Sequence, residues 1–167
     1  MKILFLGGQK SGKSHLALLK TLQIAKKKPL YIATYIDNFN DREMKKRIKN
    51  HSLERKDRFD LIEQGIHLYK TIKKSRHKTI LIDCLSIWIF NKLEQKTAQK
   101  EILKEIKKIL KLKKDIVFII NDISNSTIAI DKSTREFVDT TGLVAQLVAK
   151  KSKKVYQAIY GIQKRIK

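Results

Sequence analysis

Residues 2–18, KILFLGGQKSGKSHLAL, contain the pattern G-x-x-x-x-G-K-[S/T] between an apolar run and the start of a helical pattern. Gly7, Gly12, Lys13 and Ser14 take its fixed positions. A strand before the pattern and a helix after it form the context in which such a loop binds phosphates. A glycine-rich turn that only happens to end in Lys-Ser is the alternative, and it does not require this context. We therefore expect the loop to bind a nucleoside triphosphate, GTP or ATP.

Each residue type in this loop has a physical task. The two fixed glycines tolerate backbone angles that a side chain would forbid, so successive N–H groups can turn inward around an anion. The positive end of the following helix adds to this attraction. Lys13 is expected to reach the β- and γ-phosphates, and the Ser14 hydroxyl to ligate Mg²⁺. The expected nucleotide-binding residues of the loop are Gly7, Gly8, Gln9, Lys10, Ser11, Gly12, Lys13 and Ser14.

Apolar runs and amphipathic helical patterns alternate along the chain. Continuous apolar strands indicate a sheet buried on both faces, and their alternation with helices indicates parallel pairing. We therefore expect an α/β, P-loop NTPase-like three-layer fold, with a mostly parallel central sheet covered by helices on both faces, in one domain over residues 1–167. The expected strands are 2–6, 30–34, 59–63, 79–83, 116–120 and, as the final one, 154–160; the expected helices are 14–27, 41–51, 65–75, 84–93, 98–114 and 134–151.

Two acids stand at the ends of expected strands. A P-loop protein usually has a second acid at the end of a neighbouring strand, where it supports the magnesium site. Asp83 closes the apolar run TILID and is our candidate for this catalytic and metal-binding role, together with Ser14. Capping of the helix that follows is the alternative role for Asp83. Asp122 follows another apolar strand, at the edge where open α/β sheets gather their ligands.

The composition limits the class of protein. The 167 residues suffice for one domain with a proper core, and the single cysteine, Cys84, cannot form an internal disulfide. A reducing cytoplasm is therefore the expected location. No apolar run reaches the roughly 18 residues of a transmembrane helix, so we expect no membrane span.

The charge is strongly basic, with 38 Lys plus Arg against 16 Asp plus Glu and a formal net charge of +22. Such a field attracts polyanions or phosphorylated substrates. The lysines are spread over expected helix faces and strand entrances, without aromatic interleaving or a zinc-finger or RNA-binding signature. Solvated surfaces and a nucleic-acid site both remain open as explanations. The missing signatures favour the first, and we do not expect a nucleic-acid partner.

Further segments occur in an order typical of one enzyme family. LYIAT at 30–34 is followed by DREMKKRIKNH at 41–51, ILIDCLSIWIFNKL at 80–93, VFIIND at 117–122 and YGIQKRIK at 160–167. Together with the phosphate loop, these segments resemble the bifunctional adenosylcobinamide kinase/adenosylcobinamide-phosphate guanylyltransferase family of cobalamin biosynthesis. The resemblance covers nearly the whole chain, and YIAT followed by D-x-E-M-x-x-R-I-x-x-H is more discriminating than the loop alone.

The resemblance implies two reactions on a corrinoid. A hydroxyl on the aminopropanol arm of cobinamide is phosphorylated with GTP or ATP, and GMP from GTP then passes to that phosphate through a guanylylated histidine. The family pattern identifies His51 as this histidine and implies a homotrimer. A neutral imidazole can attack the α-phosphorus, and the resulting phosphoramidate is labile enough to pass the nucleotide on. From the residues alone, a surface histidine is the favoured interpretation of His51, because nothing local identifies a base or an orienting group. His15, His67 and His77 gain no support from the resemblance.

The same resemblance places Glu43, Arg47 and Arg55 near the transferred nucleotide. Planar guanidinium groups suit this position because they hold phosphate oxygens in pairs. An ordinary ion pair on a helix surface is the alternative for Glu43 and Arg47, since the two are four residues apart. We also include Glu63, at the end of the 59–63 strand, among the nucleotide-binding candidates.

The chain departs from the family pattern between residues 122 and 130. Asp122 replaces a glutamate, and Ser124 and Ser126 stand where the family has glycines. Side chains at glycine positions restrict the backbone and can fill space that a substrate needs, so the corrinoid pocket can change while triphosphate binding persists. Two other functions therefore stay open: a P-loop nucleotide-binding protein that acts on nucleic acid, and a kinase of another small-molecule acceptor.

Overall fold

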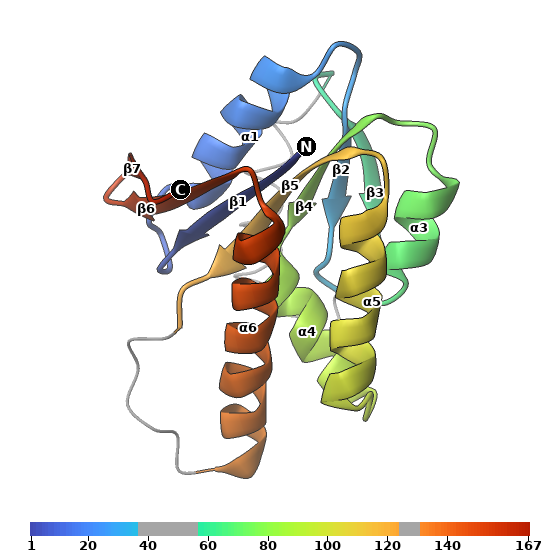
Figure 1. The fold of residues 1–167 in the computed structure, drawn as a ribbon, viewed down its shortest axis with the longest axis vertical. Coiled ribbons are helices and arrows are strands. Elements are labelled where there is room, and N and C mark those ends of the chain that lie inside the picture. Colours follow the sequence, from blue (N-terminus) through green and yellow to red (C-terminus); the bar gives the residue numbers. More distant parts are fainter. Residues whose placement is uncertain (37–56, 124–130) are drawn as a thin grey trace.

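A computed structural model describes residues 1–36, 57–123 and 131–167 of the chain. In these residues seven strands form one sheet in the order β3-β2-β4-β5-β1-β6-β7 (Figure 1). All neighbouring strands run parallel except the last pair, which is antiparallel. The strands are β1 (Lys2–Gly7), β2 (Leu30–Ala33), β3 (Asp60–Glu63), β4 (Thr79–Asp83), β5 (Asp115–Asn121), β6 (Lys154–Ile159) and β7 (Ile162–Arg165).

Helices cover both faces of this sheet, which confirms the expected α/β fold with a mostly parallel sheet (Figure 1). One core cluster packs α1 against Ile3 and Phe5 of β1, and the other packs the remaining helices against Leu4 of the same strand. Successive strand residues point to opposite faces, so a strand buried on both sides must be apolar throughout. The helices are α1 (Lys13–Ile24), α3 (Leu68–Lys74), α4 (Leu85–Glu94), α5 (Gln99–Lys111) and α6 (Lys132–Lys151).

The described elements begin and end within three residues of the expected bounds, and the expected strand list lacks one strand. The expectation that 154–160 is the final strand is wrong, because β7 follows it and pairs antiparallel with β6. All four residues of β7 are exposed, so the apolar pattern used to find strands is absent there. Helix α3 begins at Leu68 rather than at Gly65, and the helix expected over 41–51 lies outside the described residues.

The basic residues of α5 illustrate where many lysines lie. Ile102, Ile106 and Ile109 are fully buried, whereas the lysines of this helix between positions 100 and 111 are exposed. This arrangement supports solvated helix faces as the explanation of the charge for α5. None of the described helices is long and apolar enough to cross a membrane.

Candidate functional site

The phosphate loop joins the carboxyl end of β1 to the first turn of α1. Gly12 precedes the helix with a φ of 86°, in the left-handed region that favours glycine. A Cβ on Gly7 would lie 2.7 Å from the Ala158 carbonyl oxygen, so a side chain at that position would collide with β6. Both fixed glycines are therefore required by the geometry of this chain. The residue that precedes α1 is Gly12, which has no side chain to cap the helix.

Lys13 is folded over this loop. Its Nζ donates a hydrogen bond to the Gly8 carbonyl oxygen at 3.0 Å, and the side chain is largely buried. Burial lowers the pKa of Lys13 from its ordinary value, and the nearby Cys84 and Asp83 oppose this effect. An anion beside the ammonium group would stabilise its charged form. The electrostatics of the loop thus suit a polyphosphate.

Asp83 and Ser14 meet at the edge of the sheet. The Ser14 hydroxyl donates to Asp83 Oδ1 at 3.4 Å, and the Tyr31 hydroxyl donates to Asp83 Oδ2. The structure therefore brings both expected metal-site residues together. The alternative role of Asp83 as a helix cap is wrong, because Cys84 is the residue that precedes α4 and it makes no side-chain capping hydrogen bond.

Thr34, which directly follows the neighbouring strand β2, supports the end of β4. Its Oγ1 accepts a hydrogen bond from Cys84 N at 2.9 Å and lies 2.7 Å from the Cys84 carbonyl oxygen. The Thr34 N–H also donates to the Asp83 carbonyl oxygen at 3.0 Å. Burial raises the pKa of the Cys84 thiol to about 12, so this thiol is not a nucleophile at neutral pH. Thr34 therefore holds the backbone that presents Asp83.

A second layer of polar contacts supports the backbone of Thr34. Asn91 of α4 donates through Nδ2 to the Thr34 carbonyl oxygen at 2.8 Å and to that of Gly65 at 3.2 Å. Trp88 Nε1 donates to the Ile66 carbonyl oxygen at 2.9 Å. Trp88 and Asn91 of α4 thus hold the segment between β3 and α3, and Asn91 joins this segment to Thr34 at the end of β2.

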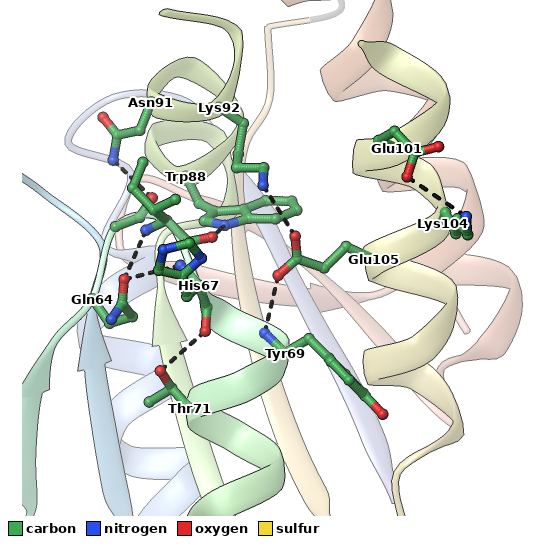
Figure 2. A network of polar contacts seen from close by, with 12 residues as sticks. Gln64, His67, Tyr69, Thr71, Trp88, Asn91, Lys92, Glu101, Lys104 and Glu105 are labelled. Carbon is green, nitrogen blue, oxygen red and sulfur yellow. Dashed lines mark hydrogen bonds and ion pairs between the residues drawn. The ribbon is translucent and has the colours of Figure 1, made fainter. Parts of the chain in front are cut away.

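An ion pair extends this layer to α5. Lys92 Nζ lies 3.2 Å from Glu105 Oε2, and Glu105 Oε1 accepts a hydrogen bond from Tyr69 N at 3.1 Å (Figure 2). Both side chains of the pair are largely shielded from solvent, so water screens them less than it would an exposed pair. Helices α3, α4 and α5 are therefore joined by polar contacts on the side of the sheet opposite to α1.

Asp122 and Glu63 lie, like Asp83, at the carboxyl ends of the parallel strands. The Asp122 N–H donates to the Gly7 carbonyl oxygen at 2.9 Å, next to the phosphate loop. Glu63 is in register with Ala33, which is in turn in register with Asp83. Glu63 is exposed and stands two strands from Asp83, roughly 10 Å at ordinary strand spacing.

Several expected site residues lie outside the described part of the chain. These are His51, Glu43, Arg47 and Arg55, together with Ser124 and Ser126 of the altered loop. Two residues that the structure places at the site were not singled out from sequence. Tyr31 and Thr34 both occur within LYIAT, so the signal was present in a segment used only as a family signature.

The described residues fit a nucleotide with its magnesium ion. Gly8 has open space beyond its Cα, and Ser11 Oγ is buried with no hydrogen-bond partner among the described residues. No group of three or more His, Cys, Asp or Glu gathers in the described ranges. Mg²⁺ in nucleotide sites is usually held by one or two protein oxygens together with waters and substrate phosphates. The Ser14 hydroxyl and the Asp83 carboxylate would supply two such oxygens.

The fold is similar to that of two archaeal proteins of known structure. For the flagellar accessory protein FlaH from Methanocaldococcus jannaschii the TM-score is 0.51 at 15% identity, over 99% of this chain and 77% of that one. For the KaiC-like protein PH0186 from Pyrococcus horikoshii OT3 the TM-score is 0.51 at 12% identity, over 93% and 69%. At these identities the similarity shows the fold alone, an α/β P-loop-like fold.

Two sequence comparisons concern function more directly. The family model described as cobinamide kinase / cobinamide phosphate guanyltransferase matches residues 3–166. The bifunctional adenosylcobalamin biosynthesis protein CobP of Pseudomonas aeruginosa is 28% identical over 172 residues, which cover 97% of this chain and 95% of that protein. Both the family model and CobP therefore match this chain over nearly its full length.

Proposed function

The chain belongs to the cobinamide kinase / cobinamide phosphate guanyltransferase family, and we propose that it phosphorylates adenosylcobinamide with GTP or ATP and then transfers GMP from GTP through His51. The family and the CobP relative support a kinase and nucleotidyltransferase of cobalamin biosynthesis. The identity of the nucleotide and the histidine intermediate are the proposed parts.

The observation that carries the proposal is that Ser14 hydrogen-bonds Asp83 at the carboxyl end of β4, while Lys13 Nζ lies over the phosphate loop on the Gly8 carbonyl oxygen. Lys13 would neutralise charge on the β- and γ-phosphates, and Ser14 with Asp83 would hold Mg²⁺. The bound ion would supply charge neutralisation to the phosphates. Positioning and electrostatic stabilisation are most of what phosphoryl transfer requires from a protein.

The first proposed reaction is a phosphoryl transfer. A hydroxyl oxygen on the cobinamide side arm attacks the γ-phosphorus, the bond between that phosphorus and the β,γ-bridging oxygen breaks, and a nucleoside diphosphate leaves. The hydroxyl proton is released in this step. The product is cobinamide phosphate, which is the acceptor in the second reaction.

The second proposed reaction proceeds in two stages. A neutral nitrogen of His51 attacks the α-phosphorus of GTP, and pyrophosphate leaves. A phosphate oxygen of cobinamide phosphate then attacks the same phosphorus, the N–P bond breaks, and GDP-cobinamide forms. Glu43, Arg47, Arg55 and Glu63 would line the nucleotide in this reaction, with the arginines paired to phosphate oxygens.

Three further features belong to the proposal. Residues 1–167 would form one domain, the domain would assemble into a homotrimer, and the protein would act in the cytoplasm. Family resemblance supports the trimer, and the single cysteine supports a reducing compartment.

Product analysis tests the proposed activity directly. The purified full chain is incubated with adenosylcobinamide, Mg²⁺ and either GTP or ATP, and the corrinoid products are identified by mass. We expect cobinamide phosphate with a competent phosphoryl donor and GDP-cobinamide when GTP is present. Folded protein that yields neither product would refute the proposed function.

A further inference from the structure

The turn between β6 and β7 lies directly against the phosphate loop. The Gly161 N–H donates a hydrogen bond to the Ser11 carbonyl oxygen at 2.9 Å. A Cβ built on Gly12 would lie 2.9 Å from the Gly161 Cα, so the two backbones are in close contact. Strand β6 also pairs with β1, which places this hairpin beside the strand that enters the loop (Figure 1). The turn and the loop therefore form one surface.

Tyr160 occupies a backbone conformation that tyrosine seldom adopts. Ile159 pairs with Ile162, so Tyr160 and Gly161 are the two central residues of the turn, with φ values of 50° and 81°. Positive φ at both positions is typical of a type I′ turn, in which asparagine and glycine are preferred. The Tyr160 side chain is 94% exposed, so packing in the described structure does not compensate for this unfavourable choice. Unfavourable conformations of this kind cluster at functional sites.

The strand order determines which part of a nucleotide would lie near Tyr160. The expected metal ligand Asp83 ends β4, on one side of β1, whereas the hairpin lies on the other side. The metal and the terminal phosphates belong with Ser14 and Asp83. The α-phosphate and the nucleoside then extend from the loop toward β6 and β7. This placement rests on the proposed triphosphate site.

We propose that Tyr160 is a stacking platform for the purine base of the triphosphate bound at the phosphate loop. The exposed ring offers an aromatic face, and Ile159 and Ile162 beside it are 44% and 73% exposed. Stacking on an aromatic ring tolerates any base, because every base has a π-face. Tyr160 thus strengthens the binding of GTP and ATP alike and does not choose between them. Groups elsewhere would set any purine preference.

Two variants of Tyr160 separate the ring from the turn. Tyr160→Asn removes the ring but introduces Asn-Gly, the sequence that type I′ turns prefer, so the hairpin and its contact with Ser11 persist. Tyr160→Phe keeps the ring and removes the hydroxyl. Dissociation constants are measured by calorimetry with Mg²⁺ and three probes: GTP, ATP and inorganic tripolyphosphate, which has no base. Thermal melting of each variant confirms that it is folded.

We expect Tyr160→Asn to weaken both GTP and ATP binding by about 5- to 150-fold, the range that removal of one base–aromatic stack produces. Its affinity for tripolyphosphate stays at the wild-type value, and Tyr160→Phe binds all three probes like the wild type. Unchanged GTP and ATP binding by Tyr160→Asn overturns the stacking role. An equal loss with tripolyphosphate also overturns it, because the turn then acts through the shape of the loop. A wild-type protein that binds none of the probes instead refutes the triphosphate site itself.

Discussion

Ser14 Oγ lies 3.4 Å from Asp83 Oδ1, although 69 positions separate the two residues in the chain. Ser14 is in the first turn of α1 and Asp83 is the last residue of β4, and β5 lies between β1 and β4 in the sheet. The pair therefore joins the phosphate loop to a strand that is not its neighbour. This geometry is what a magnesium site between a hydroxyl and a carboxylate needs.

Lys13→Ala is expected to weaken triphosphate binding and to lower both reactions. The loss of one preorganised cationic donor should reduce turnover by about 100- to 1,000-fold. Without nucleotide the variant should melt no lower than the wild type, because burial lowers the pKa of Lys13 and so disfavours its charged form in the folded state. Lys20→Ala, in the exposed part of the same helix, is the matched control. Wild-type turnover by Lys13→Ala would exclude the proposed role.

Asp83→Asn is expected to shift the magnesium dependence of turnover. The amide is neutral, so the Mg²⁺ concentration for half-maximal activity should rise by about 10- to 100-fold, as for other residues that support a metal. A magnesium titration of the steady-state rate measures this shift. Asp60→Asn is the control. Asp60 is the first residue of β3, so it lies at the amino ends of the parallel strands, whereas Asp83 lies at their carboxyl ends. If wild type and Asp83→Asn gave the same magnesium titration, Asp83 would have no role in metal binding.

His51→Ala is expected to stop nucleotidyl transfer and to leave phosphorylation intact, because the two proposed reactions use different groups. Incubation with GTP labelled at the α-phosphate should leave covalent label on the wild type and on His67→Ala, but not on His51→Ala. His67 is an exposed histidine that precedes α3 and serves as the control. Normal GMP transfer by His51→Ala would disprove the covalent mechanism.

Thr34→Val is expected to destabilise the end of β4. Valine has a similar shape but leaves the buried N–H of Cys84 without its acceptor, at a cost of about 1–3 kcal/mol in the free energy of unfolding. Thr34→Ser keeps the hydroxyl and should lose much less. Chemical denaturation measures both, and a magnesium titration should show weaker binding only for valine. If the two variants were equally stable, the hydrogen bond from Cys84 N to the Thr34 hydroxyl would not stabilise the end of β4.

The stability of the fold is expected to depend on pH through the Asp60 carboxylate. Its carboxylate contacts His77 Nε2 at 2.6 Å and Lys28 Nζ at 3.1 Å, and these hydrogen bonds lower the pKa of Asp60 below its ordinary value of 3.8. The stabilisation is therefore present above that ordinary value and is lost as the pH falls through the lower pKa of the folded state. The Asp60 side chain is 48% exposed, so water screens these contacts, and the melting temperatures of wild type and Asp60→Asn should differ only slightly at neutral pH and converge in acid.

A matched change elsewhere checks this assignment. Glu101→Gln alters an exposed ion pair with Lys104, whose atoms are 3.7 Å apart, and such pairs contribute little. Its melting temperature should follow that of the wild type across the same pH range. A constant gap between wild type and Asp60→Asn from neutral to acid conditions would show that ionisation of Asp60 is not the cause.

Much of the site could be predicted because its signals are local. The strand, the loop and the helix around Gly7 and Lys13 are continuous in sequence, so the hydrophobic pattern and the motif place them together. Asp83 was found from its position after an apolar run, since parallel strands end at one edge of a sheet. Strand β7 was missed because its exposed residues carry no alternating pattern and the turn before it lacks the usual Asn-Gly signal.

The amino-acid order alone specified the α/β class, the phosphate loop and the acid at a strand end, because each is written in adjacent residues. The strand order that inserts β5 between β1 and β4 comes from the folded sheet. The folded sheet also determines three contacts: Asp83 with Tyr31, Thr34 with Cys84, and Gly161 with Ser11. These contacts join residues that are distant in the chain, and they form only when packing selects one arrangement of the strands.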